Sequence, residues 1–486
     1  MLDFVAVAVA LGLLIYLAFR GVTLLILAPA TALLAVLISG GQPLLASYTQ
    51  IFMSNTGAFI VAFFPLFMLG AIFGKLMEDT GSAEALARGV SGWLGPERSI
   101  VSVVICCGVL TYGGVSAFVV AFAVFPIAAA LFRSADIPKR LIPGTLALGS
   151  FTFTMSALPG TPAIQNAIPM PFFGTTAFAA PGLGIIAAVL MFVLGIAWLN
   201  RRAATARAKG EGYGAHQDNL PVPDVATREH ALSQGFDIAE LAPTPAATEH
   251  RPLPPFGLAL LPVLVVIVTN FVFIEIVVPA MDTSYLADPL FGSTTIEAVR
   301  GVWAVIVALL LAILILIAGN WRRLVDLKTS LDRGADASVL PIFNTASLVG
   351  FGAVIAALPV FAVISEAVMA VGRGNALISV AASVTALSGI TGSASGGMSI
   401  ALDTLGSTLV DMARETGVSL DAMHRVTAIA SGALDVLPHN GAVITLLAVC
   451  GLSHRESYGD VFVVACAVQM LALVVTILLA SLFGSF

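Results

Sequence analysis

Two ionisable residues, Asp435 and His439, lie four positions apart in an otherwise apolar stretch of the chain. One helical turn can bring both side chains to the same face, although Pro438 between them can distort that turn. Charged groups inside apolar segments are costly and usually serve function. An imidazole exchanges protons near neutral pH, and a partly desolvated aspartate can join it. The pair predicts proton coupling; the alternative is a buried pair that only fixes a broken helix.

Two proline-containing motifs carry neutral polar residues that can bind a small carboxylate. The motifs are Leu158-Pro159-Gly160-Thr161-Pro162 and Leu437-Pro438-His439-Asn440-Gly441. Neither motif contains arginine or lysine, so backbone amides, helix ends and hydroxyls would hold the anion, which suits a monocarboxylate. The substrate-binding residues predicted in and around these motifs are Gly160, Thr161, Gln165, Asn166, Asn440 and Thr445.

Two glycine-rich clusters complete the candidate site, one around Gly113 and one around Gly392. Gly113 precedes Pro159 by 46 positions, and Gly392 precedes Pro438 by the same 46. Equal spacing with similar chemistry at both ends predicts an internal duplication. Close helix packing is the alternative role for such glycines. The residues predicted here to bind substrate are Tyr112, Gly113, Gly114, Ser116, Thr391, Gly392, Ser393 and Ser395.

These clusters and motifs are expected to interrupt helices, because proline removes a backbone donor and glycine loosens a turn. Interrupted backbone is tolerated at membrane depth only where protein buries it or where it lines a wet cavity. Four interruptions, two in each half, would bring helix N-termini together near the middle of the membrane. Such termini attract a carboxylate.

The elements that position these residues must be membrane helices. Of the 486 residues, 58% are hydrophobic and only 10% charged, against about 25% charged in soluble proteins. All four cysteines lie in apolar runs without metal-ligand spacing, so they are interpreted as packing residues. Full crossings are predicted near 2–19, 22–39, 51–74, 140–174, 181–200, 256–280, 301–318, 338–370, 421–450 and 461–485.

The predicted fold is an all-α polytopic membrane protein with two inverted repeats, at 1–200 and 256–486, joined by a polar linker at 201–255. Each repeat contains a hairpin, at about 99–133 and 375–411, and a discontinuous helix, at about 140–174 and 421–450. The 34 uncharged residues between Arg98 and Arg133 are fewer than the roughly 40 that two crossings need, so a re-entrant hairpin fits better. Both options return the chain to the same face.

The distribution of basic residues predicts the orientation. If the linker is cytoplasmic, 18 of the 22 lysines and arginines lie on its side, and Arg300, Arg373, Arg414 and Arg425 lie outside. Both termini of this predicted inner-membrane protein then face the periplasm. An odd number of crossings in each half makes the second half enter from the opposite face, as in an inverted repeat. His424, at the flank of a span, is expected to be solvated.

The residues 158–166 and 433–442 resemble the gluconate:proton symporter (GntP) family of the ion transporter superfamily. The stretch 450–458 looks like the version in 3-hydroxybutyrate permease-like members. The resemblance covers nearly the whole chain, and its proline motifs are more specific than its glycine clusters. It implies import of a hydroxylated monocarboxylate with protons, a homodimer, and a mobile transport domain that moves against a fixed scaffold in an elevator-like manner.

The sequence therefore predicts a proton-coupled symporter for a small organic anion, with gluconate and 3-hydroxybutyrate as candidates. No cofactor is expected, and the partners are the substrate, the lipid bilayer and a second copy, without nucleic acid. Sodium coupling stays open, because hydroxyl and carbonyl ligands also suit sodium. A membrane-embedded enzyme is the remote alternative, since the sequence shows no nucleophile or metal constellation.

Overall fold

The computed structural model describes residues 2–216 and 252–486, except positions 21, 116, 362, 364, 365, 367–369, 371, 373 and 439. Ser116, His439 and most of the predicted linker therefore lie outside the described residues. All regular structure within the described ranges is helical. This confirms the prediction of an all-α chain.

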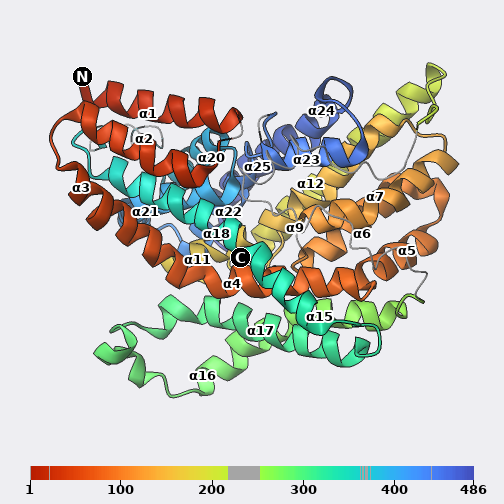
Figure 1. Cartoon of the computed structure of the whole chain (residues 1–486), viewed down its shortest axis with the longest axis horizontal. Helices are drawn as coiled ribbons and strands as arrows, with labels where there is room; N and C mark the ends of the chain where they lie inside the picture. Colours follow the sequence, from red (N-terminus) through yellow and green to blue (C-terminus); the bar gives the residue numbers. More distant parts are fainter. Residues whose placement is uncertain are drawn as a thin grey trace.

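The first half contains two long spans and several shorter helices (Figure 1). Its elements are α1 (Leu2–Phe19), α2 (Leu24–Ser39), α3 (Leu44–Ala46), α4 (Met53–Asp79), α5 (Ser82–Leu94), α6 (Ser99–Tyr112), α7 (Ala117–Ser134), α8 (Ile142–Ser150), α9 (Phe153–Ser156), α10 (Ile164–Ala167), α11 (Pro169–Phe173) and α12 (Pro181–Ala208).

The second half also contains both long and short helices. Its elements are α15 (Phe256–Val272), α16 (Val278–Ala280), α17 (Ile296–Asn320), α18 (Leu327–Ala356), α20 (Ala376–Thr391), α21 (Ala394–Thr416), α22 (Leu420–Gly432), α23 (Gly441–Cys450), α24 (His454–Phe462) and α25 (Val468–Phe483).

Within the described residues, six helical segments are long and apolar enough to cross a membrane. They are Leu44–Asp79, Pro181–Ala208, Phe256–Ala280, Ile296–Asn320, Leu327–Ala356 and His454–Phe483. These segments agree with a multi-pass membrane protein. The orientation of the termini stays a prediction.

The helices are interrupted at four places. Residues 113–116 separate α6 from α7, and residues 392–393 separate α20 from α21; we call these two turns the hairpin tips. Residues 151–163, around the short helix α9, form the first break, and residues 433–440 form the second break. Prolines contribute to both breaks, because Pro159, Pro162 and Pro438 have no backbone N–H to continue a helix.

The centre of the molecule is the crossing of α4 and α18, which pack along each other (Figure 1). Small residues allow the close approach: a Cβ atom at Gly334 would lie 2.7 Å from the Cα of Ile72, and one at Gly350 would lie 2.8 Å from the carbonyl oxygen of Phe52. Membrane helices commonly approach through small residues in this way. The crossing therefore fixes one wall of the molecular interior.

The sequence analysis did not predict α5, between the predicted crossing 51–74 and the first predicted hairpin. α5 is amphipathic and buries Ala83, Leu86 and Val90, while Arg88 and Glu84 stay toward solvent. It packs against α6 and α15. The segment contains too many polar residues to register as an apolar run, which is why a search for membrane crossings passes over it.

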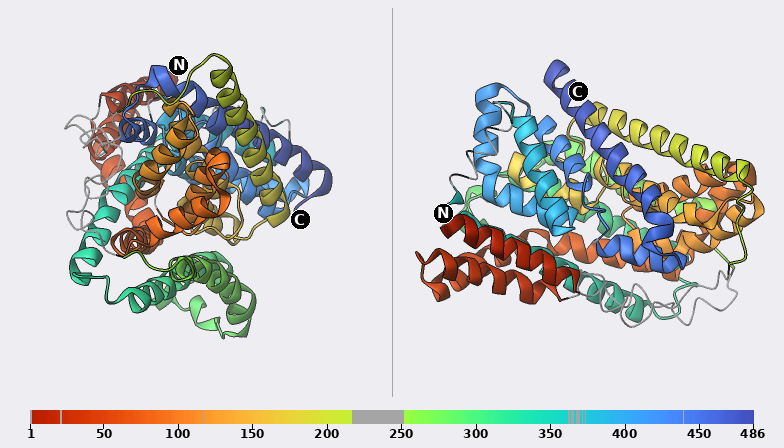
Figure 2. Two further views of the ribbon diagram at one scale, coloured as in Figure 1. Left: turned by 90° about the vertical axis from the view of Figure 1, so that its right-hand side faces the viewer. Right: turned by 90° about the horizontal axis from the view of Figure 1, so that it is seen from above.

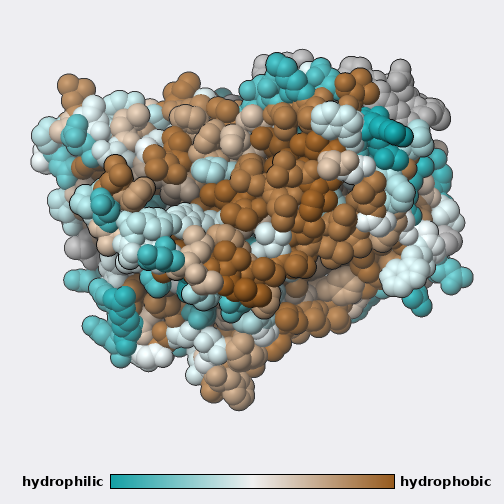
Figure 3. Space-filling model, turned by 90° about the horizontal axis from the view of Figure 1, so that it is seen from below, coloured by the Kyte–Doolittle hydropathy of each residue, from teal (hydrophilic) through white to brown (hydrophobic). Residues whose placement is uncertain are grey.

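The remaining helices surround this centre (Figure 2). α15, α16 and α17 form a layer along one side, and α1 and α2 lie next to each other at another. α12 lies beside α25. Exposed apolar residues recur at helical spacing on α12, at Ile185, Val189 and Val193. A space-filling view shows a broad apolar area with hydrophilic residues toward its edges (Figure 3), as expected for a surface in contact with lipid.

An ion-pair network joins helix ends at the side predicted to be cytoplasmic. Buried Asp460 accepts hydrogen bonds from Arg202 Nε at 2.8 Å and from Arg140 Nη1 at 3.3 Å. Arg140 also donates to Glu211 at 2.6 Å, and this bond holds the pKa of the Glu211 carboxyl below its ordinary value. The network ties the start of α8 and the last turn of α24 to the end of α12.

The close contact between α20 and α21 predicts that a larger side chain at Gly397 destabilises the protein. A Cβ atom at Gly397 of α21 would overlap the backbone of Ser388 in α20, so Gly397→Ala should lower the free energy of unfolding by about 1–3 kcal/mol. Thermal unfolding of detergent-purified protein measures this loss.

Gly57 of α4 provides the matched control, because a Cβ atom there meets nothing within 4 Å. Gly57→Ala should be neutral or stabilise the protein by up to about 1 kcal/mol. Equal stability of the two variants would contradict the close packing of the hairpin.

Candidate functional site

Both hairpin tips and both breaks border one cavity of about 310 Å³. The volume lies at the lower end of the range typical of small-molecule sites, about 300–1,000 Å³. Residues of the tips and breaks that line it include Gly114, Gln165, Gly392, Ser393, Ser395, Asp435 and Asn440. Segments about 280 positions apart in sequence thus contribute to the same space.

Four helices begin at this cavity: α7, α10, α21 and α23. Ser393 caps α21 by accepting a hydrogen bond from the Gly396 amide at 3.1 Å, and Asn440 caps α23 by accepting from the Ala442 amide at 2.5 Å. The first turn of a helix carries backbone N–H groups without helical partners and the positive end of its dipole. The cavity wall therefore favours a negatively charged guest.

Asp435 introduces a carboxyl group into the same wall. The residue is only 6% exposed, and its Oδ1 atom has no hydrogen-bond partner among the residues that the structure describes. None of the ion pairs among the described residues includes it. A buried carboxylate without a cation is strongly disfavoured, so this group requires a proton or another bound cation. Its predicted partner His439 lies outside the described residues.

Each hairpin tip is tied to the break of its own half by one side chain. In the first half, the Tyr112 hydroxyl at the end of α6 donates to the carbonyl oxygen of Pro159 at 2.6 Å. In the second half, Asn440 Nδ2 donates to the carbonyl oxygens of Gly392 at 2.7 Å and of Asp435 at 2.5 Å. Tip and break are therefore held together in both halves.

Arg425 of α22 reaches across to the first break. It is 0% exposed, and its guanidinium donates to the carbonyl oxygens of Ala157 at 3.1 Å, Ala177 at 3.2 Å and Ala179 at 2.8 Å, and to Asn166 Oδ1 at 3.2 Å. Neither proline motif contains a basic residue, but this arginine reaches the first break from a helix of the other half. Five donors in a rigid fork suit such a cluster of carbonyls.

His424 beside it is also fully buried, so the expectation of a solvated side chain is wrong. Its ring nitrogens hydrogen-bond to the Thr175 hydroxyl at 2.6 Å and to Asn166 Oδ1 at 3.1 Å. Asn166 Nδ2 in turn donates to the carbonyl oxygens of Thr161 and Ala177. The cluster of Arg425, His424 and Asn166 fixes the polar backbone of the first break.

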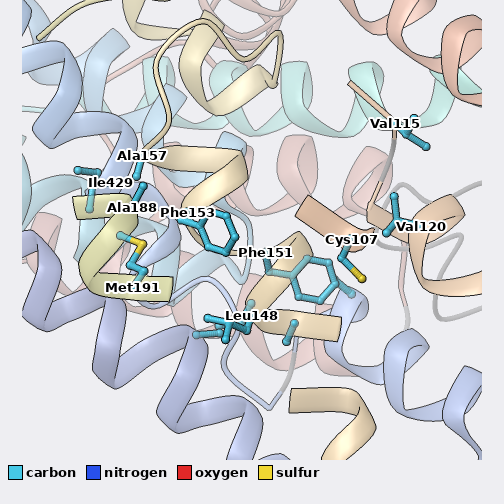
Figure 4. Close-up of a cluster of buried hydrophobic side chains, with 14 of the residues drawn as sticks. Cys107, Val115, Val120, Leu148, Phe151, Phe153, Ala157, Ala188, Met191 and Ile429 are labelled. Carbon is cyan, nitrogen blue, oxygen red and sulfur yellow. The ribbon is translucent and has the colours of Figure 1, made fainter. Parts of the chain in front are cut away.

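Buried apolar side chains also support the first break (Figure 4). Phe151, Phe153 and Leu148 point into a buried group that includes Met191 of α12 and Ile429 of α22. Phe153 also meets Phe192 edge to face, with ring centroids 5.8 Å apart. This packing attaches the break to helices of both halves.

The remaining predicted site residues lie near the cavity but not on its wall. Gly113 faces Val263, Gly160 faces Phe178, and the Thr391 hydroxyl bonds to the carbonyl oxygen of Leu387 in its own helix. The predicted residues that do not line the cavity are Tyr112, Gly113, Gly160, Thr161, Asn166, Thr391 and Thr445. Ser116 lies outside the described residues. Tyr112 and Asn166 instead position the tips and breaks.

The sequence analysis missed the contribution of α18, which lines the cavity with Ser338, Pro341, Asn344 and Thr345. These polar and proline residues lie within the predicted apolar run 338–370. The available signal was their helical spacing on one face, which a search for apolar crossings does not weigh. Within the described ranges, no cluster of three or more His, Cys, Asp or Glu side chains could hold a metal ion.

The Arg425 contacts predict that this residue is essential for stability. Arg425→Met removes five charge-assisted hydrogen bonds and leaves buried carbonyls without donors, so unfolding should become easier by about 3 kcal/mol or more. Arg414→Met, at an exposed position of α21, should change stability by less than about 0.5 kcal/mol. Thermal unfolding in detergent compares the two, and similar melting temperatures would refute the role of Arg425.

Comparison with known proteins finds similarity to a transporter over the full length of the chain. The chain is 41% identical to the "Uncharacterized transporter YxjC" of Bacillus subtilis (strain 168), over 99% of this chain and 100% of the relative. No family model matches the chain.

Proposed function

The chain belongs to the same family as the uncharacterized transporter YxjC of Bacillus subtilis, and from this premise we propose that it is a proton-coupled symporter. Its substrate is a small hydroxylated monocarboxylate such as gluconate or 3-hydroxybutyrate, which it imports across the inner membrane. The resemblance of residues 158–166 and 433–442 to the gluconate:proton symporter family supports the same substrate class.

The observation that carries the proposal is the meeting of four helix starts at a single cavity with the Asp435 carboxyl group, whose Oδ1 has no partner in the described part of the chain. The helix starts favour the substrate carboxylate. Asp435 disfavours it while ionised, because two negative charges then share a poorly hydrated space. Once Asp435 takes up a proton, the repulsion ends and the anion can bind. Proton and substrate therefore promote each other's binding, as reciprocal linkage requires.

The proposed architecture has two inverted repeats. Its support is that Gly392 lies 279 positions after Gly113, and Pro438 lies 279 positions after Pro159. The same shift relates α6 to α20 and α8 to α22 within a few residues. In this proposal the hairpins and breaks form a mobile transport domain, the other helices form a dimeric scaffold, the linker is cytoplasmic and both termini are periplasmic.

Uptake by purified protein in proteoliposomes tests the function. We expect labelled 3-hydroxybutyrate or gluconate to accumulate when the outside is more acidic than the inside, without added sodium. Collapse of the proton gradient by an ionophore should abolish accumulation. Uptake that requires sodium and ignores the proton gradient would favour a sodium-coupled carboxylate transporter, and absence of any monocarboxylate uptake would reject the proposal.

Asp435→Asn should abolish proton-driven accumulation, at least about tenfold, because the amide cannot carry the coupling proton. Exchange of labelled for unlabelled substrate should persist, since exchange needs no net proton movement. Asp403→Asn, at an exposed position of α21 away from the cavity wall, is the matched control and should retain accumulation. Full accumulation by the Asp435 variant would remove this residue from the coupling mechanism.

A further inference from the structure

We propose that Asn344, in the middle of α18, recognises a hydroxyl group of the transported acid. The inference rests on the proposed function and deepens it, because it names the part of the substrate that α18 binds. Asn344 belongs to neither proline motif nor glycine cluster.

Asn344 lies on the face of α18 that borders the cavity. Ala337, Pro341, Asn344 and Leu348 follow one another at intervals of three or four residues along this face, and all four line the cavity. Pro341 cannot donate the helical hydrogen bond to the carbonyl oxygen of Ala337. The carbonyl oxygen of Ala337 therefore has no helical donor at this position, and α18 offers the cavity a backbone acceptor that a regular helix would not.

The amide of Asn344 differs from its polar neighbours in having no partner. The Ser338 hydroxyl donates to the carbonyl oxygen of Ala335 at 2.6 Å, and the Thr345 hydroxyl donates to that of Pro341 at 3.0 Å. Asn344 is only 2% exposed, yet neither its Nδ2 nor its Oδ1 has a hydrogen-bond partner within the described part of the chain. Buried amides are normally bonded, so these atoms await a ligand.

The chemistry of the amide selects the ligand group. Asn344 offers donors at Nδ2 and an acceptor at Oδ1, whereas a carboxylate can only accept and would leave Oδ1 unpaired. A hydroxyl group donates and accepts, so it can satisfy both atoms. The carboxylate has better partners at the starts of α7, α21 and α23, where backbone N–H groups are available. The two ends of a hydroxylated acid thus have separate partners.

A second buried asparagine provides a comparison for Asn344. Asn270 of α15 is 0% exposed, and neither of its amide atoms has a partner among the described residues, but it does not line the cavity. Unpartnered amide atoms alone therefore do not mark a binding residue. What distinguishes Asn344 is that its amide lies on the wall shared by the hairpin tips and breaks.

Competition assays in proteoliposomes test the inference. Uptake of labelled 3-hydroxybutyrate is inhibited with unlabelled 3-hydroxybutyrate or with butyrate, which has the same carboxylate and chain length but no hydroxyl group. We expect the wild type to prefer the hydroxylated acid. In Asn344→Leu the inhibition constant for 3-hydroxybutyrate should rise by about three- to tenfold, while that for butyrate stays within about twofold.

Asn270→Leu is the matched control and should keep the wild-type ratio of the two inhibition constants. Asn344→Ala carries the same expectation as the leucine variant and gives the result if that variant fails to assemble, as judged by size-exclusion chromatography. An unchanged ratio in the Asn344 variants, or an equal change in Asn270→Leu, overturns the inference and leaves the proposed function intact. A wild type that takes up no monocarboxylate overturns both.

Discussion

Every backbone N–H and C=O group inside a bilayer needs a partner, and this requirement governs the whole molecule. The hairpin tips and breaks release such groups in the most apolar part of the chain, where lipid offers no hydrogen bonds. The chain meets the requirement by enclosing these segments in protein. Tyr112, Asn440 and Arg425 each supply donors to free carbonyl oxygens.

The same constraint explains why the cavity is polar on some sides and apolar on others. Where caps and ties consume the released groups, the interior closes, as around Asn166 and Thr161. Where helix starts border the cavity, as at Ser393 and Ala117, the interior stays available to a charged guest. An interrupted helix thus leaves backbone groups that need partners. Where side-chain donors satisfy these groups the segment is structural, and where they do not, the groups can bind a ligand.

The sequence predicted the helical class and positions at which helices are interrupted, because proline, glycine and long apolar runs act locally. It also directed attention to Asp435, since an acidic residue in an apolar run is rare enough to be noticed alone. It failed for Arg425 and His424, which lie next to polar residues at a helix start and look solvated until the fold buries them. It also missed Asn344, whose significance comes from a wall built by distant segments. Contacts between residues that lie far apart in the sequence cannot be recognised from the local composition.

Four of the five hydrogen bonds from Arg425 end on main-chain oxygens, those of Ala157, Ala177 and Ala179. A main-chain oxygen is present whatever the side chain, so these three positions can drift in evolution without losing the contact. Arg425 itself has no such freedom. Methods that infer proximity from paired substitutions would therefore overlook this junction between the halves, although it is among the most heavily bonded in the protein.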